Sequence, residues 1–183
     1  MMSITPEAFS RQFPALHLPP EGYDALLKVL KPVDLKAGVR LVIQGGRSDT
    51  LYFLLSGHLQ ITLQSDNTKL VLGELDPGRW VAEFGFIDPG PAAANVEAIE
   101  NVSALALTQA GMNSLHEASP NTASALLQSL SLDLAERLRA TSRHTLEKNA
   151  DNQYILRQPV DVQDESWLSR IGRMLMGTGG NEP

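Results

Sequence analysis

The spacing of hydrophobic residues changes twice along the chain, from a helical period to an alternating one and back. Apolar residues recur every three or four positions over residues 5–16 and again over residues 20–30. The first of these segments opens with Thr5-Pro6, a pair typical of a helix N-terminus. We expect Pro32 to end the second segment, because proline cannot continue a helix. Two short N-terminal helices are therefore predicted.

Alternation with a period of two then extends from residue 33 to about residue 107. Leu59, Ile61 and Leu63, for example, are separated by polar residues, which is the pattern of a half-buried strand. Glycine-rich turn signals separate the alternating runs at nearly regular intervals. Many short strands with such spacing predict a β-sandwich or β-barrel.

The helical period returns after residue 107. A short helix is predicted to end before Pro120, and a long one to run over residues 121–149 with Asn121 as its N-cap. Its apolar stripe is narrow because charged residues flank it, which favours a dimer seam; packing of a single helix on its own barrel is the alternative. The stripe consists of Leu127, Leu130, Leu134 and Leu138.

These patterns divide the chain into N-terminal helices over 1–32, a β domain with its long helix over 33–149, a polar linker over 150–165, and a last segment over 166–183. Within the last segment, Trp167–Met176 is amphipathic and precedes a glycine-rich tail. Its apolar side could enter a partner groove or a membrane interface, or fold back on the β domain. With about three turns and two arginines, stable membrane anchoring is not expected.

Composition narrows the function classes. The 183 residues are 43% hydrophobic, carry a net charge of −6 and include no cysteine. Disulfides and thiolate metal sites are thereby excluded, and broad nucleic-acid binding is disfavoured. No membrane span and no signal peptide are visible, so we expect a cytoplasmic protein. The four histidines show no metal-binding spacing, and no catalytic motif is present, so neither a metal nor an enzymatic activity is expected.

Two stretches carry a family resemblance. "LVIQGGRSDTLYFLLSGHLQITL" (41–63) has glycines at Gly45 and Gly57 around a Leu-Tyr strand, and "LGELDPGRWVAEFGFID" (72–88) has a turn glycine before a short helical piece. Together with the order of elements over about residues 30–149, they resemble cyclic nucleotide-binding domains, most closely the effector domain of bacterial catabolite-activator-type regulators. The resemblance implies a mostly β fold with flanking helices: a double-stranded β-helix, or jelly-roll-like β-roll, with short N-terminal helices and a long C-terminal dimerisation helix.

The resemblance also implies a ligand site around a phosphate-binding cassette. There, backbone N–H groups at a helix start face the cyclic phosphate, and Glu83 would accept a hydrogen bond from the ribose 2′-hydroxyl. The ligand would also meet the backbone of Phe84, Ala93 and Ala94. Ala82 replaces the family's glycine, and Ala93 stands where the family has its phosphate-binding arginine. Loss of that charge-assisted bond corresponds to an affinity decrease on the order of 10- to 1000-fold.

Three residues of the long helix extend the resemblance. In activator-type relatives an arginine at the position of Arg137 approaches the phosphate side, and a Thr-Ser pair at Thr141 and Ser142 contacts adenine across the dimer. Arg137 could thus pair with Glu83 or partly replace the missing cation. Only residues 148–183 remain after this helix, and they lack two adjacent helical patterns, so no DNA-binding domain is expected.

Two functional hypotheses follow from the sequence. The first is a stand-alone, homodimeric regulatory domain that senses a small cyclic nucleotide similar to cAMP through an atypical cassette. The second is a degenerate domain that binds no nucleotide and serves as a dimerisation or protein-interaction scaffold for an unidentified partner.

Overall fold

The computed structural model of the chain describes residues 4–65 and 68–149, with the backbone alone at residues 141 and 143–149. The chain divides into two compact units, residues 1–136 and residues 137–183. The expected linker and the Trp167–Met176 segment lie outside the described residues. Within the part of the chain that is described, no helix is long and apolar enough to cross a membrane.

Two short helices open the chain, as the hydrophobic spacing predicts: α1 (Pro6–Gln12) and α2 (Gly22–Val29). Thr5 caps α1, because its hydroxyl oxygen accepts a hydrogen bond from the backbone N–H of Ala8 at 3.2 Å. The helix α2 ends before Pro32, as expected. The backbone is already extended at Leu30, and Pro32 lies within β1 at the edge of a sheet, where proline is tolerated.

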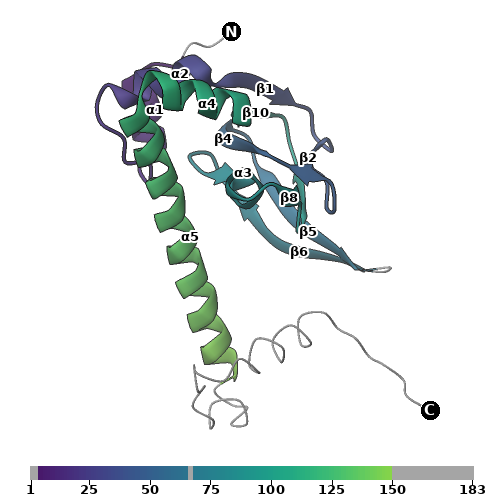
Figure 1. Ribbon diagram of the computed structural model, residues 1–183. Coiled ribbons are helices and arrows are strands. Elements are labelled where there is room, and N and C mark those ends of the chain that lie inside the picture. The colour runs from purple at the N-terminus through teal and green to yellow at the C-terminus, as the bar shows by residue number, and fades with distance from the viewer. Residues whose placement is uncertain (1–3, 66–67, 150–183) are drawn as a thin grey trace, which may run out of the picture. The chain divides into compact units, whose positions relative to one another are not determined.

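Antiparallel strands form the middle of the chain and confirm the predicted β-roll (Figure 1). One sheet has the order β1-β10-β4-β7, a second has the order β2-β9-β5-β6, and β3 pairs with β8 in a small third sheet. The strands are β1 (Lys31–Leu35), β2 (Arg40–Val42), β3 (Arg47–Ser48), β4 (Thr50–Ser56), β5 (Leu59–Ser65), β6 (Thr68–Leu75), β7 (Trp80–Val81), β8 (Gly90–Pro91), β9 (Asn95–Ala98) and β10 (Val102–Thr108).

The predicted glycine turns lie where the backbone needs them. Gly45, Gly57 and Gly78 all have positive φ, a region that L-residues with a side chain enter only at a cost. At Gly57 there is also no room, since a Cβ atom would lie 2.3 Å from the carbonyl oxygen of Asn101. Glycine at this turn is therefore required by both the dihedral angle and the close approach.

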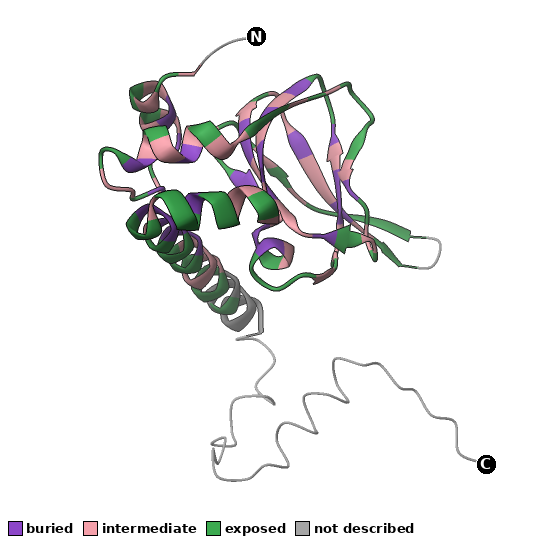
Figure 2. Ribbon diagram, turned by 45° about the horizontal axis from the view of Figure 1, so that its top comes forward, coloured by how far each residue is buried: buried purple, intermediate pink, exposed green. Residues whose placement is uncertain are grey.

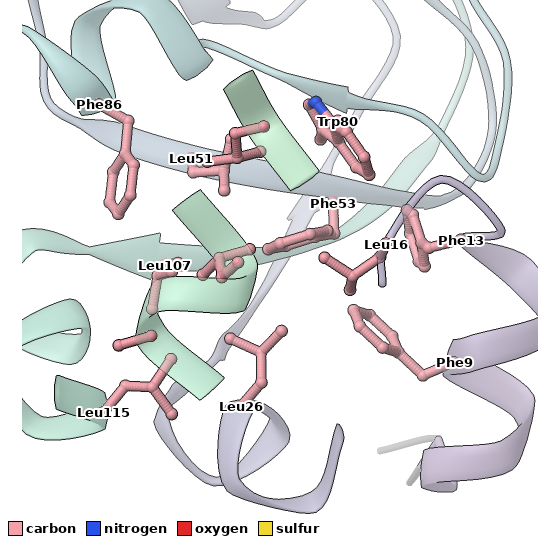
Figure 3. Close-up of a cluster of buried hydrophobic side chains, with 13 residues drawn as sticks. Phe9, Phe13, Leu16, Leu26, Leu51, Phe53, Trp80, Phe86, Leu107 and Leu115 are labelled. Atoms are coloured by element: carbon pink, nitrogen blue, oxygen red, sulfur yellow. The ribbon is translucent and has the colours of Figure 1, made fainter. Parts of the chain in front are cut away.

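Strand β4 separates two hydrophobic clusters. Its residues Leu51 and Phe53 face the helices, whereas Leu54 joins a cluster formed by both large sheets. Figure 3 shows the ring of Phe53 in the middle of the helix-side cluster, near Phe9 and Phe13. The helix-side cluster, called here the aromatic core, consists of Phe9, Phe13, Leu16, Leu26, Leu51, Phe53, Trp80, Phe86, Leu107, Leu115, Ala123, Leu126 and Leu130.

Two helices follow the last strand, β10: α4 (Gln109–Ala118) and α5 (Pro120–Asn149). The expected N-cap at Asn121 was wrong, because α5 already begins at Pro120, a position where the missing N–H of proline costs nothing.

The predicted stripe on α5 divides into two sides. Leu130 is fully buried in the aromatic core together with Leu126, whereas Leu127 is 40% exposed. In the second unit Leu138 is 68% exposed. The helix therefore packs on its own domain through one side and leaves part of the stripe uncovered.

Candidate functional site

The cassette expected around Glu83 is a short helix, α3 (Glu83–Ile87), that follows directly on β7. The chain enters it through Ala82, whose φ of 70° and ψ of 21° place it in the left-handed region. Within residues 4–65 and 68–149, Ala82 is the sole non-glycine residue with positive φ. Such a conformation costs an L-residue roughly 1–2 kcal/mol. The site is therefore entered through a strained residue where the family has glycine.

Small residues allow α3 to approach its neighbours closely. A Cβ atom on Gly85 would lie only 2.2 Å from the carbonyl oxygen of Ser48 in β3. On the other side, the side-chain amide of Gln109 donates a hydrogen bond to the carbonyl oxygen of Phe86 at 2.7 Å. The helix is thus held between β3 and the first residue of α4.

The two sides of α3 differ in burial (Figure 2). Glu83 is 2% exposed and Phe86 is 3% exposed, whereas Phe84 is 70% exposed and Ile87 is 44% exposed. Burial of a carboxylate is costly, so proteins retain one where it is hydrogen-bonded or has a functional task. Glu83, which the resemblance selects as the ribose contact, is therefore a buried carboxylate at the first residue of α3.

The loop after α3 is fixed by its backbone. Gly45 donates its N–H to the carbonyl oxygen of Ala92, and Ala92 donates its N–H to the carbonyl oxygen of Gly46, both at 2.8 Å. Ala93, in the arginine position, is exposed, and Ala94 is partly buried. The loop thus keeps an ordered backbone although its three alanines contribute no charge.

Sequence reasoning missed two features of this loop. Asn95 is 7% exposed, and its side-chain oxygen accepts the N–H of Gln44 at 3.0 Å, which ties β9 to the turn after β2. Arg47 lies opposite Pro91 in the β3–β8 pair. A cation therefore lies across the ladder from Pro91, the residue before the alanine loop (residues 92–94). It could not be found by searching for a cation along the loop itself.

The three site residues expected on α5 belong to the second unit. Arg137 is partly buried, Ser142 is exposed, and Thr141 is described by its backbone. All three have helical backbone in α5. Their approach to Glu83 stays a prediction.

A separate ionic cluster surrounds His58 in the turn between β4 and β5. Its Nδ1 contacts the carboxylate of Glu100, and its Nε2 lies 3.4 Å from the carboxylate of Asp76. The hydrogen bond to Glu100 raises the pKa of His58 above its ordinary value, and the charges of Asp76 and Glu74 add to this effect. Among the described residues, neither this cluster nor any other brings three or more such side chains into an arrangement that could hold a metal ion.

Comparison with known proteins agrees with this geometry. Residues 32–119 match the model of the family described as cyclic nucleotide-binding domain. A CRP-like cAMP-activated global transcriptional regulator of Mycobacterium tuberculosis is 29% identical over 126 residues, which are 68% of this chain and 54% of that protein. The chain thus spans about half the length of the curated relatives that it matches first.

Solved structures show the same fold. A cyclic nucleotide-binding domain from Methylobacillus flagellatus superposes with a TM-score of 0.70 at 17% identity, over 78% of this chain and 85% of that one. The catabolite activator protein of Thermus thermophilus superposes with a TM-score of 0.64 at 26% identity, over 72% of this chain and 61% of that one. The β-roll and the helix start at Glu83 lie in the part of the chain, residues 32–119, that matches the cyclic nucleotide-binding domain family.

Proposed function

We propose that this domain is regulatory and senses a cyclic nucleotide similar to cAMP through a cassette without the usual arginine. The observation that carries the proposal is Glu83, a carboxylate 2% exposed at the first residue of α3 in a domain of this family. The printed name of the mycobacterial relative, a cAMP-activated regulator, supports the same class of ligand. In the proposed complex the Glu83 carboxylate accepts a hydrogen bond from the ribose hydroxyl. The backbone at Phe84, Ala93 and Ala94 contacts the phosphate.

The phosphate would be bound more weakly than in a cassette with an arginine. Ala93 is exposed and supplies no charge. A charge-assisted hydrogen bond contributes about 1.5–3 kcal/mol, so its absence weakens binding by about 10-fold or more. Arg137 of α5 is proposed to supply part of the missing charge. Thr141 and Ser142 are proposed to contact the base, as the resemblance implies.

A second function is favoured by the same substitutions. Ala82 is strained and Ala93 is uncharged, so two positions of the phosphate-binding cassette differ from the pattern of the family. The domain would then serve as a dimerisation or protein-interaction scaffold and would need no nucleotide. Both functions share a homodimer formed through the predicted stripe on α5, where Leu127 is 40% exposed.

Titration of the chain with cAMP, cyclic GMP and cyclic di-GMP distinguishes the two functions. At about 100 times its dissociation constant, a ligand stabilises the folded state by ~2.7 kcal/mol, which thermal unfolding detects readily. Ala93→Arg should strengthen binding by at least about tenfold, and Glu83→Gln should weaken it. A flat response of wild type and of Ala93→Arg at millimolar nucleotide would leave the scaffold function as the explanation.

The dimer is tested separately by sedimentation. Leu127→Lys places a charge on the uncovered side of α5 and should shift the chain toward monomer, whereas Gln128→Lys, on an exposed neighbour, should not. A wild-type chain that stays monomeric at high concentration would contradict the dimer. It would also contradict the sensing and scaffold functions in the dimeric form proposed here.

In the sensing function, the ligand acts by favouring one position of α5 over another. Such coupling requires a difference in affinity between two states and can be no larger than that difference. Hydrogen exchange of α5 with and without nucleotide measures it directly. Unchanged exchange in a chain that binds nucleotide would mean that the signal leaves the domain elsewhere.

A further inference from the structure

A cavity with a volume of about 270 Å³ lies where the three sheets meet, between β2, β3 and the beginning of β4. It is lined by residues 40–43, 46–50 and 52. Neither α3 nor the alanine loop contributes to its lining. The lining therefore shares no residue with the proposed nucleotide contacts, although it adjoins α3 through Ser48 and the alanine loop through Gly46.

The lining of this cavity contains more cations than carboxylates, unlike the chain as a whole. The chain carries a net charge of −6, yet the lining includes two arginines, Arg40 and Arg47, and a single carboxylate, Asp49. The arginine side chains are 52% and 78% exposed, whereas Val42 is 9% and Ser48 is 8% exposed. The cations thus lie toward solvent, and the buried part of the lining is apolar or carries a hydroxyl.

Both arginines are already oriented by acidic partners. The Nε of Arg47 lies 2.7 Å from the Asp49 carboxylate, and the Nε of Arg40 lies 3.4 Å from that of Glu97 across the strand pair. A guanidinium has five N–H donors in a planar fork, so it can hold a second acceptor while such a contact persists. The ion pairs therefore hold the cations in place and leave them able to bind an anion.

Hydroxyl donors complete the lining. Tyr52 faces the cavity from β4, and burial raises the pKa of its phenol, so the hydroxyl remains a donor at neutral pH. Thr50 lies on the same strand, and its hydroxyl donates a hydrogen bond to the Asp49 carboxylate at 3.3 Å. The volume lies just below the ~300–1,000 Å³ of sites for drug-sized ligands, which limits the occupant to a compact molecule.

We propose that this cavity binds a small phosphate monoester, with its phosphate between Arg40 and Arg47 and its short organic part toward Val42 and Tyr52. A phosphate monoester carries close to two negative charges at pH 7 and three acceptor oxygens, which matches two guanidinium groups from different strands. A monocarboxylate carries a single negative charge and would pair with one guanidinium group alone. The site adds a second ligand to the domain and does not depend on the cassette.

Calorimetric titration of the full chain with glycerol phosphate, against sodium chloride of equal ionic strength, tests the proposal. We expect saturable binding that weakens at least about tenfold in Arg47→Gln and in Arg40→Gln. Asp49→Asn should instead strengthen binding, because it removes the competing carboxylate. Arg11→Gln, an exposed arginine on α1, is the matched control and should leave binding unchanged.

Three results would overturn the proposal. Binding could be absent, it could be equally weakened by Arg11→Gln, or acetate could bind as tightly as glycerol phosphate. Glu83→Gln separates this site from the cassette, because it should weaken cyclic nucleotide binding and leave glycerol phosphate binding intact. Loss of both in Glu83→Gln would place the phosphate in the cassette and contradict a second site.

Discussion

The aromatic core and the cassette around α3 are built by opposite means. In the core, the ring of Phe53 lies 5.4 Å from that of Phe13 and 5.5 Å from that of Phe9, so bulk fills the space. At the cassette, Gly85 lies against the backbone of Ser48, and small residues leave space for it. One region is stabilised by side-chain atoms and the other requires their absence. Mutations that remove atoms and mutations that add them should therefore affect different regions.

The largest effect is expected when atoms are removed from the core. Phe53→Ala should lower the free energy of unfolding by about 3–5 kcal/mol, because it deletes a fully buried ring that also contacts Trp80. Phe84→Ala is the control, since Phe84 is 70% exposed on α3, and it should change stability little. Urea denaturation measures both. Equal losses would mean that the cassette is packed like the core.

The next largest effect is expected when one methyl group is added at the cassette. Gly85→Ala should destabilise the fold by about 1–3 kcal/mol, because its Cβ would overlap the Ser48 carbonyl and force α3 away from β3. Gly73→Ala in β6 is the matched control, since a Cβ there meets no atom within 4 Å. Thermal unfolding compares the two. A neutral Gly85→Ala would show that α3 is not held against β3.

A gain is expected from removing a methyl group at the entrance to α3. Ala82→Gly should raise the free energy of unfolding by up to about 1 kcal/mol, because it relieves the left-handed strain at φ 70°. The gain stays below the full strain, because the mutation also removes a partly buried methyl group. Ala94→Gly, with no positive φ to relieve, should not be stabilising. A loss in Ala82→Gly would mean that packing outweighs strain at this position.

The smallest effect is expected outside both regions, at His58. Its folded-state pKa is raised above the ordinary 6.5, so its contribution is fully present below about pH 6.5 and is lost as the pH rises through the raised pKa. His58→Gln should therefore reduce stability slightly at pH 6 and leave it unchanged at pH 9. His116→Gln, exposed on α4, is the control. The effect is expected to be small because solvent screens this exposed cluster. A larger loss of stability at pH 9 than at pH 6 would contradict the expected direction of the pH dependence.

Local signals in the sequence sufficed for much of the β-roll. The Thr5 cap and the turns at Gly45 and Gly57 depend on single residues and were predicted correctly. The alternating period was predicted from residue 33, whereas β1 begins at Lys31, because pairing with β10 and not local propensity made this segment a strand. Chain reversals and element order are thus recoverable from patterns, whereas strand partners are not.

The candidate site was predictable in its position and less so in its surroundings. Glu83 and the start of α3 were selected through the family resemblance, and the replacement of glycine by Ala82 was noted without its left-handed conformation. Arg47 was missed, since it precedes the loop by more than 40 residues and meets it through the β3–β8 pair. Which cation faces a loop is decided by tertiary pairing, which no local pattern encodes.

The hydrogen bond from Gln109 to the Phe86 carbonyl has a mechanical consequence. It joins the last turn of α3 to the first residue of α4, and the Phe86 ring lies in the same cluster as Leu115 of α4. The hydrogen bond therefore couples the position of α3 to that of the beginning of α4. A displacement of α3 by as little as 1 Å must either carry α4 with it or break a bond whose net contribution is about 1 kcal/mol.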